Sequence, residues 1–432
     1  MRPSDWLRAR LQVRHRPQRH AWLADLLQAQ ILHPAALHAM QQQRLQALLR
    51  HAVAEVPYYR QRFAGLDLAR PEQLPTLHKA EVRAHRDALL ADSADRTQAR
   101  IGHTSGSSGQ PLSFWYDTEK HERMRAGMLR GFMLTGWQPG EKVLYFWGAA
   151  HDMAKGGIFG GTAWQTWLAG ERTLTANRYG ETELAAWAHT LHTYRPRLLY
   201  GYPSAMSALA RFMLDTRQAP PRSLAGVIST AETLTATQRD TMQQAFACQV
   251  FNQYGCREVP NIAWECRHGS LHVMSDLVWL ESDPADDSLR VTALSNRQMP
   301  FIRYALGDHG RLLDAPGEAG CACGLPFPRM AMDIGRQNDV IRLPDGTRLQ
   351  PGVFNRLLDG ERWLLEYQWV QTGPQALTLR FVAASPAPSD FAGQLEQRLG
   401  VAAPGLVLTI EAVNELQRGD NGKHRYVLAW PG

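Results

Sequence analysis

The 432-residue sequence predicts an α/β fold, with a large N-terminal domain and a small α+β domain at the C-terminus. Between residues 142 and 255, short apolar runs alternate with helical stretches, which is typical of parallel β-α-β units. Residues 270–313 contain short strand-like runs separated by turn residues, which indicates antiparallel pairing. The chain is also longer than one hydrophobic core usually supports, which favours two domains.

Helical patterns dominate the first ninety residues. Residues 34–63 carry apolar side chains at helical spacing, and Pro57 is expected to end this amphipathic helix. A second helical stretch is expected over residues 74–90. The first twenty residues are rich in arginine, and a solvated or frayed helix is the favoured interpretation. Contact with an anionic surface is the alternative.

Polar turns follow three of the apolar runs in the α/β region. They are "GYPSA" at residues 201–205, "STAE" at 229–232 and "YGCRE" at 254–258. Ligands of open α/β sheets bind at the carboxyl ends of the strands. These turns are therefore candidate site segments.

The second half of the chain combines antiparallel strands with a change in composition. The strand-like runs of residues 270–313 are expected to form a small β-barrel-like part of the large domain, beside its parallel or mixed sheets. Residues 314–330 are rich in Gly, Pro and Cys, and a domain boundary near Ile334 gives domains 1–333 and 334–432. The smaller domain is expected to contain a hairpin at "LPDGTR", three further strands and one helix.

The composition is that of an ordinary soluble globular protein, with 44% hydrophobic and 20% charged residues. The net charge of +6 is spread along the chain, which argues against a nucleic-acid partner. No apolar run is long enough for a membrane span, and the N-terminus lacks the apolar core of a signal peptide. A cytoplasmic location is therefore expected.

The five cysteines do not indicate a disulfide framework, because their number is odd and the expected location is cytoplasmic. Two pairs of sulfur and nitrogen donors from separate segments are enough for a closed tetrahedral zinc site. These are Cys266 with His272, and Cys321 with Cys323. His268 could take the place of His272, and buried free thiols are the alternative to zinc. Cys248 and Cys256 are interpreted as core or near-site residues.

The stretch "TSGSSGQP", residues 104–111, has two interpretations by itself. Its hydroxyls can donate hydrogen bonds, and its glycines let backbone N–H groups approach an anion, as in a loop that holds a polyphosphate. A flexible linker is the other interpretation. No Lys-Ser/Thr pair follows the last glycine, so it is not a Walker A loop.

Five segments in order resemble the signatures of the adenylate-forming superfamily of acyl-CoA synthetases, nonribosomal adenylation domains and luciferases. They are "TSGSSGQP", "YGCREVPNIAWEC", "RYALGDHGRL", "GRQNDVI" and "RGDNGKHRYVL". Further segments resemble one branch, the phenylacetate-CoA ligase and CapK-like group; they include "PEQLPTLHKAEVR", "GYPSAMSALA" and "ISTAETLTATQRDTMQQAF". The resemblance covers nearly the whole chain after its first thirty residues, and it implies a large adenylation domain with a mobile C-terminal domain.

The resemblance implies that the protein binds ATP and Mg²⁺, and it assigns a role to each matching residue. The phosphates would be held by Thr104, Ser105, Gly106, Ser107, Ser108 and Gly109, and the rest of the nucleotide by Ala231, Glu232, Tyr254, Gly255, Asp308 and Arg336. Glu258 would bind Mg²⁺, and Lys423 would contact the substrate carboxylate and the α-phosphate as the catalytic lysine. Some members of the group also bind a structural zinc at residues similar to Cys266, His272, Cys321 and Cys323.

The implied activity is an ATP-dependent acid–thiol ligase that forms an acyl-adenylate and transfers the acyl group to coenzyme A. The acid would be an aryl or other apolar carboxylic acid, in a pocket that includes Trp147, His151, Phe159 and Gly160. Transfer to an amine or to a carrier-protein thiol is the alternative, and some CapK-like proteins stop at adenylation. The resemblance leaves a homodimer open.

Two positions depart from the superfamily pattern. Gln110 stands where the loop usually has lysine, and Asn338 stands where the hinge usually has an acid or lysine, with Asp339 next. These departures motivate a hypothesis of another class, an ATP-binding regulator without turnover.

Overall fold

The computed structural model describes most of the chain. The described residues are 2–97, 99–103, 112–148, 162–176, 179–336, 341–345, 347–349, 353–354, 357–358, 361, 363–383, 385–417 and 424–430.

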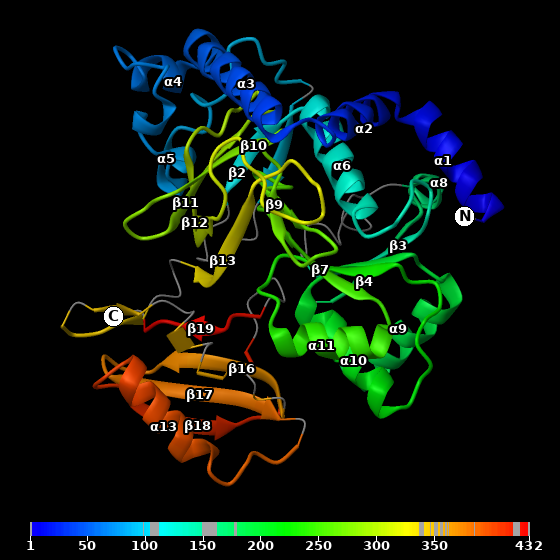
Figure 1. The fold of residues 1–432 in the computed structure, drawn as a ribbon, viewed down its shortest axis with the longest axis vertical. Helices are drawn as coiled ribbons and strands as arrows, with labels where there is room; N and C mark the ends of the chain where they lie inside the picture. The colour runs from blue at the N-terminus through cyan, green and yellow to red at the C-terminus, as the bar shows by residue number, and fades with distance from the viewer. Residues whose placement is uncertain are drawn as a thin grey trace.

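An eleven-stranded sheet forms the centre of the protein (Figure 1), with the strand order β10-β11-β12-β13-β9-β8-β7-β6-β5-β3-β4. The half from β4 to β7 is parallel, as the alternating strand and helix pattern predicts. Its strands are β3 (Val143–Trp147), β4 (Glu171–Thr175), β5 (Leu198–Gly201), β6 (Gly226–Ser229) and β7 (Gln249–Tyr254).

Helices cover both faces of this parallel half. In β3, Tyr145 packs in a core with α2 and α6, whereas the neighbouring Phe146 packs in another core with α9, α10 and α11. This alternation follows from the two-residue period of a strand. The helices on one face are α2 (Pro17–Ala29) and α6 (Thr118–Met133), and those on the other are α9 (Glu181–Tyr194), α10 (Pro203–Asp215) and α11 (Ala236–Phe246).

The other half of the sheet is antiparallel and open. Its strands are β8 (Ala263–Glu265), β9 (Leu271–Val273), β10 (Val278–Ser282), β11 (Ser288–Ala293), β12 (Tyr304–Leu312) and β13 (Arg329–Arg336). In the described part of the chain β10 pairs only with β11, so the expected barrel-like part was wrong: these strands extend the central sheet without closing on themselves. A two-stranded hairpin, β1 (Arg100–His103) with β2 (Ser113–Tyr116), lies outside this sheet.

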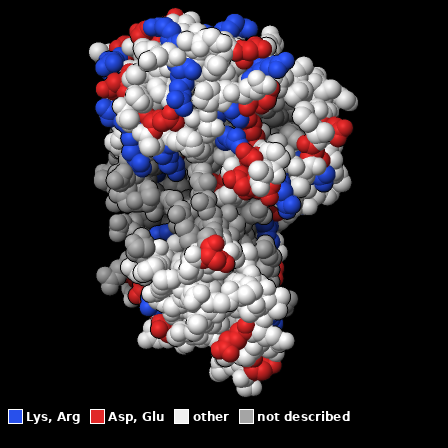
Figure 2. Space-filling model, turned by 90° about the vertical axis from the view of Figure 1, so that its left-hand side faces the viewer, with Lys and Arg blue, Asp and Glu red and all other residues white. Residues whose placement is uncertain are grey.

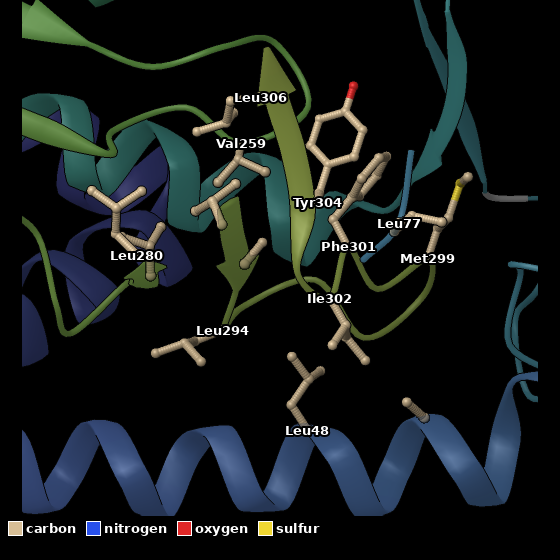
Figure 3. Close-up of a cluster of buried hydrophobic side chains, with 14 of the residues drawn as sticks. Leu48, Leu77, Val259, Leu280, Leu294, Met299, Phe301, Ile302, Tyr304 and Leu306 are labelled. Atoms are coloured by element: carbon tan, nitrogen blue, oxygen red, sulfur yellow. The ribbon is translucent and has the colours of Figure 1, made fainter. Parts of the chain in front are cut away.

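The N-terminal helices cover the antiparallel half. Figure 3 shows Leu48 of α3 (Pro34–Glu55) pointing toward Ile302, below the buried Phe301 and Tyr304. The expected end of the first helix near Pro57 is confirmed, since α3 ends at Glu55, and a short separate helix, α4 (Pro57–Arg62), follows. The next expected helix is shorter than the sequence indicated: α5 spans Lys79–Ala84, after the 3₁₀ turn η1 (Pro71–Gln73).

The arginine-rich N-terminus forms a helix that is mostly exposed, which agrees with a solvated helix, but it is docked at two charged residues and is not frayed. Helix α1 (Pro3–His15) buries Asp5 and Arg8, which form an ion pair. It packs beside α8 (Ala163–Ala169), where the side-chain amide of Gln12 donates to the carbonyl oxygen of Leu168 at 2.8 Å. In the part of the chain that the structure describes, no helix is long and apolar enough to cross a membrane.

The C-terminal elements form their own sheets and core. The "LPDGTR" hairpin joins β14 (Ile341–Arg342) to β15 (Arg348–Leu349), and a second sheet has the order β18-β17-β16-β19. Its elements are β16 (Leu364–Gln371), β17 (Ala376–Ala383), α13 (Phe391–Ala402), β18 (Val407–Ala412) and β19 (Val427–Leu428). Strand β13 continues through Ile334 to Arg336, and the boundary near Ile334 stays a prediction.

Candidate active site

Three of the predicted site segments lie at the carboxyl ends of adjacent parallel strands. Strands β5, β6 and β7 are neighbours, so the turns that begin at Tyr202, Thr230 and Gly255 leave the sheet at the same edge. A shared hydrogen-bond acceptor fixes this edge: the Oε1 atom of Gln253 accepts from the hydroxyls of Tyr200 at 3.2 Å and Thr230 at 2.5 Å. The edge is therefore a rigid polar platform.

Tyr254 and Asp308 meet across this edge. The Tyr254 hydroxyl donates to Oδ2 of Asp308 at 2.9 Å, and Asp308 is the register partner of Arg336 across β12 and β13. Three residues that the resemblance assigned to the nucleotide thus converge from three strands. A carboxylate beside a tyrosine ring is suited to ribose hydroxyls next to a stacked base.

Glu258 lies at the centre of a buried group that we call the carboxylate cluster, made of Glu258, Tyr304 and Lys120. Only 3% of Glu258 is exposed, and its Oε1 atom accepts from the Tyr304 hydroxyl at 2.8 Å. Lys120, on α6, donates from Nζ to the backbone carbonyl of Glu258 at 2.8 Å and lies 4.5 Å from the ring centre of Phe114. Tyr304 therefore fixes the carboxylate of Glu258, and Lys120 fixes its backbone carbonyl.

Burial dominates the electrostatics of this cluster. Desolvation lowers the pKa of Lys120 to about 8, although Glu258, Cys256 and Asp117 oppose the shift. Burial, and next the Glu258 carboxylate, raise the pKa of the Tyr304 phenol far above its usual value. The same two causes raise the pKa of the Cys256 thiol. Tyr304 and Cys256 therefore stay neutral at pH 7, and a carboxylate is the hard oxygen ligand that Mg²⁺ prefers.

Sequence reasoning did not assign roles to Lys120 or Tyr304. Tyr304 lies within the quoted segment "RYALGDHGRL", so the segment contained a signal that was not used. Lys120 is 138 residues from Glu258 and lies in none of the segments that resemble the superfamily, so no local pattern could have identified it.

Glu232 joins the platform to the C-terminal elements. Its Oε2 atom accepts from the backbone N–H of Ser204 at 3.2 Å, and its Oε1 atom accepts from the backbone N–H of His424 at 2.8 Å. The preceding Ala231 has φ of 70°, a left-handed conformation that is uncommon for a residue with a side chain. Lys423 lies outside the described residues, but its neighbour His424 is bonded at this edge.

Several predicted residues cannot be placed. Outside the described residues are Thr104, Ser105, Gly106, Ser107, Ser108, Gly109, Gln110, His151, Phe159, Gly160, Asn338 and Asp339, and of Arg336 only the backbone is described. The residues that flank 104–112 are paired: His103 is the register partner of Ser113, and His103 Nδ1 lies 2.9 Å from Ser113 Oγ. Trp147 lies with its ring centre 4.9 Å from that of Tyr202 at the platform.

A cavity of about 340 Å³ adjoins the start of β2. It is lined by Arg83, Ala84, His85, Arg86, Asp87, Ala88 and Ser113. Asp87 pairs with Arg86 at 3.4 Å, and Arg83 and His85 leave the lining basic overall, which favours an anion.

A second group, which we call the thiol cluster, consists of Cys266, His272, Cys321 and Cys323. Their donor atoms all lie within 4.8 Å of one another, whereas the alternative ligand His268 is not part of the group. The Sγ atoms of Cys266 and Cys321 are 3.8 Å apart, and Cys323 Sγ is 3.3 Å from His272 Nε2. Two sulfurs bound tetrahedrally to one zinc ion would be about 3.8 Å apart, so the spacing fits the metal.

The imidazole of His272 is oriented for metal binding. Its Nδ1 atom donates to the carbonyl oxygen of Phe327 at 2.8 Å, so Nε2 carries the free lone pair and faces the sulfurs. The backbone N–H groups of Cys323 and Leu325 point to the Sγ atoms of Cys321 and Cys323, both at 3.5 Å. These groups can bind a thiophilic cation such as Zn²⁺.

The chain is similar in sequence to curated proteins of two kinds. No family model matches the chain. It is 26% identical over 329 residues to a phenylacetate-coenzyme A ligase of Thermus thermophilus, with 71% of each chain covered. It is 22% identical over 388 residues to Protein CapK of Staphylococcus aureus, which covers 84% of this chain and 81% of CapK.

The fold resembles that of 2-hydroxyisobutyryl-CoA ligase. The structure of that enzyme in its postadenylation state, with an acyl-AMP bound, superposes with a TM-score of 0.74 at 18% identity, and covers 93% of this chain and 91% of the enzyme. Its thioesterification-state structure, with CoA bound, gives a TM-score of 0.57. The arrangement of the described elements is therefore closer to the former state.

Proposed function

The chain belongs to the adenylate-forming superfamily, in the group of the phenylacetate-CoA ligases and CapK, and we propose that it is an AMP-forming acid–thiol ligase. Its substrates are ATP, an aryl or other apolar carboxylic acid and coenzyme A. The observation that carries the proposal is the bond between Glu232 and His424, because it joins the segment of Lys423 to the strand ends where Tyr254 and Asp308 meet.

The proposed reaction has two steps. A carboxylate oxygen of the acid attacks the α-phosphorus of ATP, and the bond to pyrophosphate breaks to leave an acyl-adenylate. The thiol sulfur of CoA then attacks the acyl carbon, its proton is released, and AMP leaves with the electron pair of the broken C–O bond. Catalysis depends on donors and cations around the phosphoryl oxygens, on which charge accumulates.

In this proposal the site residues divide the work between binding and orientation. Asp308 accepts from the ribose hydroxyls, and Tyr254 fixes that carboxylate while its ring lies near adenine. Glu258 holds Mg²⁺, which when bound would neutralise phosphate charge. Lys423 contacts the acid and the α-phosphate, and the basic cavity beside Ser113 supports a polyphosphate at this end of the site.

The proposal also names coenzyme A as the molecule that receives the acyl group. The relative from Thermus thermophilus and the structural neighbour 2-hydroxyisobutyryl-CoA ligase are CoA ligases, and the neighbour's structure with an acyl-AMP bound supports an adenylation step in this chain. Transfer to an amine or a carrier-protein thiol uses the same adenylate and is the second candidate. CoA is favoured because it is the acceptor in the enzymes to which the chain is similar.

We also propose that the thiol cluster holds a structural zinc ion. Three sulfurs and one oriented imidazole nitrogen complete a tetrahedron, which leaves no position for a substrate. Metal analysis of purified protein should find about one zinc per chain. A content near zero in protein purified without chelators would refute this assignment.

The test of the ligase proposal is acid-dependent exchange of labelled pyrophosphate into ATP, over a panel of aryl and fatty acids. At least one acid should support exchange, and addition of CoA should then release AMP and the thioester, which mass spectrometry identifies. Exchange without thioester formation, followed by amide formation with added amines, would instead select the second candidate.

The Lys423→Ala variant separates a ligase from an ATP-binding regulator. It should bind ATP with little change in Kd but lose at least about 100-fold in exchange rate. If the wild type binds ATP and no acid in the panel supports exchange, the regulator is favoured. Exchange in the variant at the wild-type rate would refute the role of the lysine.

A further inference from the structure

Helix α1 buries two charged side chains and exposes three apolar ones. Arg8 and Asp5 are buried as an ion pair, and Arg8 Nε donates to the carbonyl oxygen of Gly140 at 2.8 Å. In contrast, Trp6 and Leu7 are each 46% exposed and Val13 is 51% exposed. This is the reverse of the usual surface helix, whose apolar stripe faces the core.

Helix α8 carries two further exposed apolar side chains. Trp164 is 52% exposed and Trp167 is 42% exposed, and their rings stack with centres 5.0 Å apart. The ring of His15 lies 6.5 Å from that of Trp164, so the two helices are in direct contact, as Figure 1 also shows. We call Trp6, Leu7, Val13, Trp164 and Trp167 the α1–α8 surface.

Among the described residues of α1 and α8, the exposed charged side chains are all basic. Arg10 and Arg14 are exposed on α1, and among the described residues neither forms an ion pair. The only acid of α1 is the buried Asp5, and α8 has no charged residue. The face shown in Figure 2 differs, because Lys and Arg are interspersed there with Asp and Glu.

The packing of α1 prevents its apolar side chains from turning inward. Gly140 has φ of 91°, and a Cβ atom there would lie 2.1 Å from the backbone oxygen of Asp5. The helix therefore contacts the loop backbone directly, with Arg8 bonded to the same glycine. Rotation of α1 would leave the buried guanidinium of Arg8 without these acceptors, which is costly.

We propose that the α1–α8 surface binds an anionic lipid surface, independently of the ligase proposal. Tryptophan rings prefer the boundary between lipid headgroups and acyl chains, and arginines beside them are attracted to anionic headgroups. Arg10 lies with Cζ 3.9 Å from the ring centre of Trp6, so one residue pair offers both interactions. A second copy of the chain is disfavoured, because a two-fold contact would bring Arg10 and Arg14 toward the same arginines of the copy.

Vesicle flotation of the full chain tests this proposal. The wild type should float with vesicles of phosphatidylcholine and phosphatidylglycerol, and its partition coefficient should fall at high salt and with phosphatidylcholine alone. The double variant Trp6→Ser/Trp164→Ser and the double variant Arg10→Glu/Arg14→Glu should each lose about tenfold or more in partition coefficient.

Matched controls come from other exposed positions. Trp430 is 44% exposed on the C-terminal elements, and Arg70 and Arg311 have side chains 65% and 61% exposed. Trp430→Ser and Arg70→Glu/Arg311→Glu should float like the wild type.

Three results would overturn the proposal: no flotation of the wild type, equal flotation with phosphatidylcholine alone, or equal losses in the controls. Light scattering adds a fourth, namely a dimer that dissociates in Trp6→Ser/Trp164→Ser, which would assign the surface to a second copy. Circular dichroism checks that each variant is folded.

Discussion

The carboxylate cluster and the thiol cluster lie at opposite ends of one short strand and solve different chemical problems. Glu258 precedes β8 and Cys266 follows it, and both are buried. In the carboxylate cluster each acceptor already has a protein donor, Tyr304 for the carboxylate and Lys120 for the peptide carbonyl. In the thiol cluster four lone-pair donors converge on one point. The first group is held by protein donors alone, whereas the second has the donor set of the proposed zinc site.

The largest expected effect is that of Glu258→Gln, which should lower activity strongly and thermal stability only slightly. Glu258→Gln keeps an acceptor for Tyr304 but loses the charge that we propose binds Mg²⁺, so kcat/KM for ATP should fall at least about 100-fold. The melting temperature should change by only a few degrees, since the shape and hydrogen bond are kept. Exchange kinetics at several Mg²⁺ concentrations measure the first effect, and a calorimetric scan measures the second. Loss of folding with no separate loss of Mg²⁺ response would make Glu258 purely structural.

The thiol cluster should show the opposite result. Cys321→Ser should remove the metal and lower the free energy of unfolding by about 3 kcal/mol or more, while folded protein at low temperature keeps most of its activity. Denaturant unfolding combined with metal analysis measures this. Cys248→Ser is the matched control, because this thiol is outside the cluster, and it should cost about 1 kcal/mol or less. Equal losses in the two variants would argue against a metal site.

The smallest expected effect concerns Lys120, which supports the carboxylate cluster without being placed at the substrate. Lys120→Met should lower kcat/KM about tenfold, because the Glu258 peptide loses its donor. Lys142→Met is the control: Lys142 also donates to a carbonyl, that of Tyr194, and lies over its ring, but it is outside the cluster. Its activity should match the wild type.

The pH dependence of stability gives a second readout for Lys120. Its pKa is about 8 in the folded protein, below the value of about 10.5 for an exposed lysine. Between these values the unfolded chain binds more protons, so the unfolding free energy of the wild type minus that of Lys120→Met should rise with pH, by about 3 kcal/mol in total. Below pH 8 both states are protonated and the difference should be constant. A flat difference from pH 8 to 10 would refute the buried charge.

The sequence predicted those residues of the two clusters that lie in recognisable local patterns. The sequence predicted the four residues of the thiol cluster from two short segments, with His268 left open in place of His272, and strand-end turns located Glu232, Tyr254 and Glu258. It did not predict that β9 and β10, which are consecutive in the chain, occupy distant positions in the sheet. Asp276 lies in the turn between them and is buried with Arg130 of α6, 146 residues away. An ion pair between such distant residues has no local signature.

The expected barrel was wrong for a similar reason. Alternating apolar residues indicate strands, but closure depends on which edges pair, and that is set by long-range packing of α3 against Leu280, Ile302 and their neighbours. The inverted orientation of α1 was equally hidden, because it depends on Gly140 and Arg8, 132 residues apart.

The bond between Glu232 and His424 offers a test of whether the C-terminal elements move relative to the platform. The His424 amide proton is held by the Glu232 carboxylate, whose other oxygen is engaged by Ser204. Whenever the C-terminal elements leave the platform, this proton is released to solvent and can exchange for deuterium. Its exchange rate therefore measures how often the two parts of the molecule separate, and a ligand that holds them together should slow that one amide.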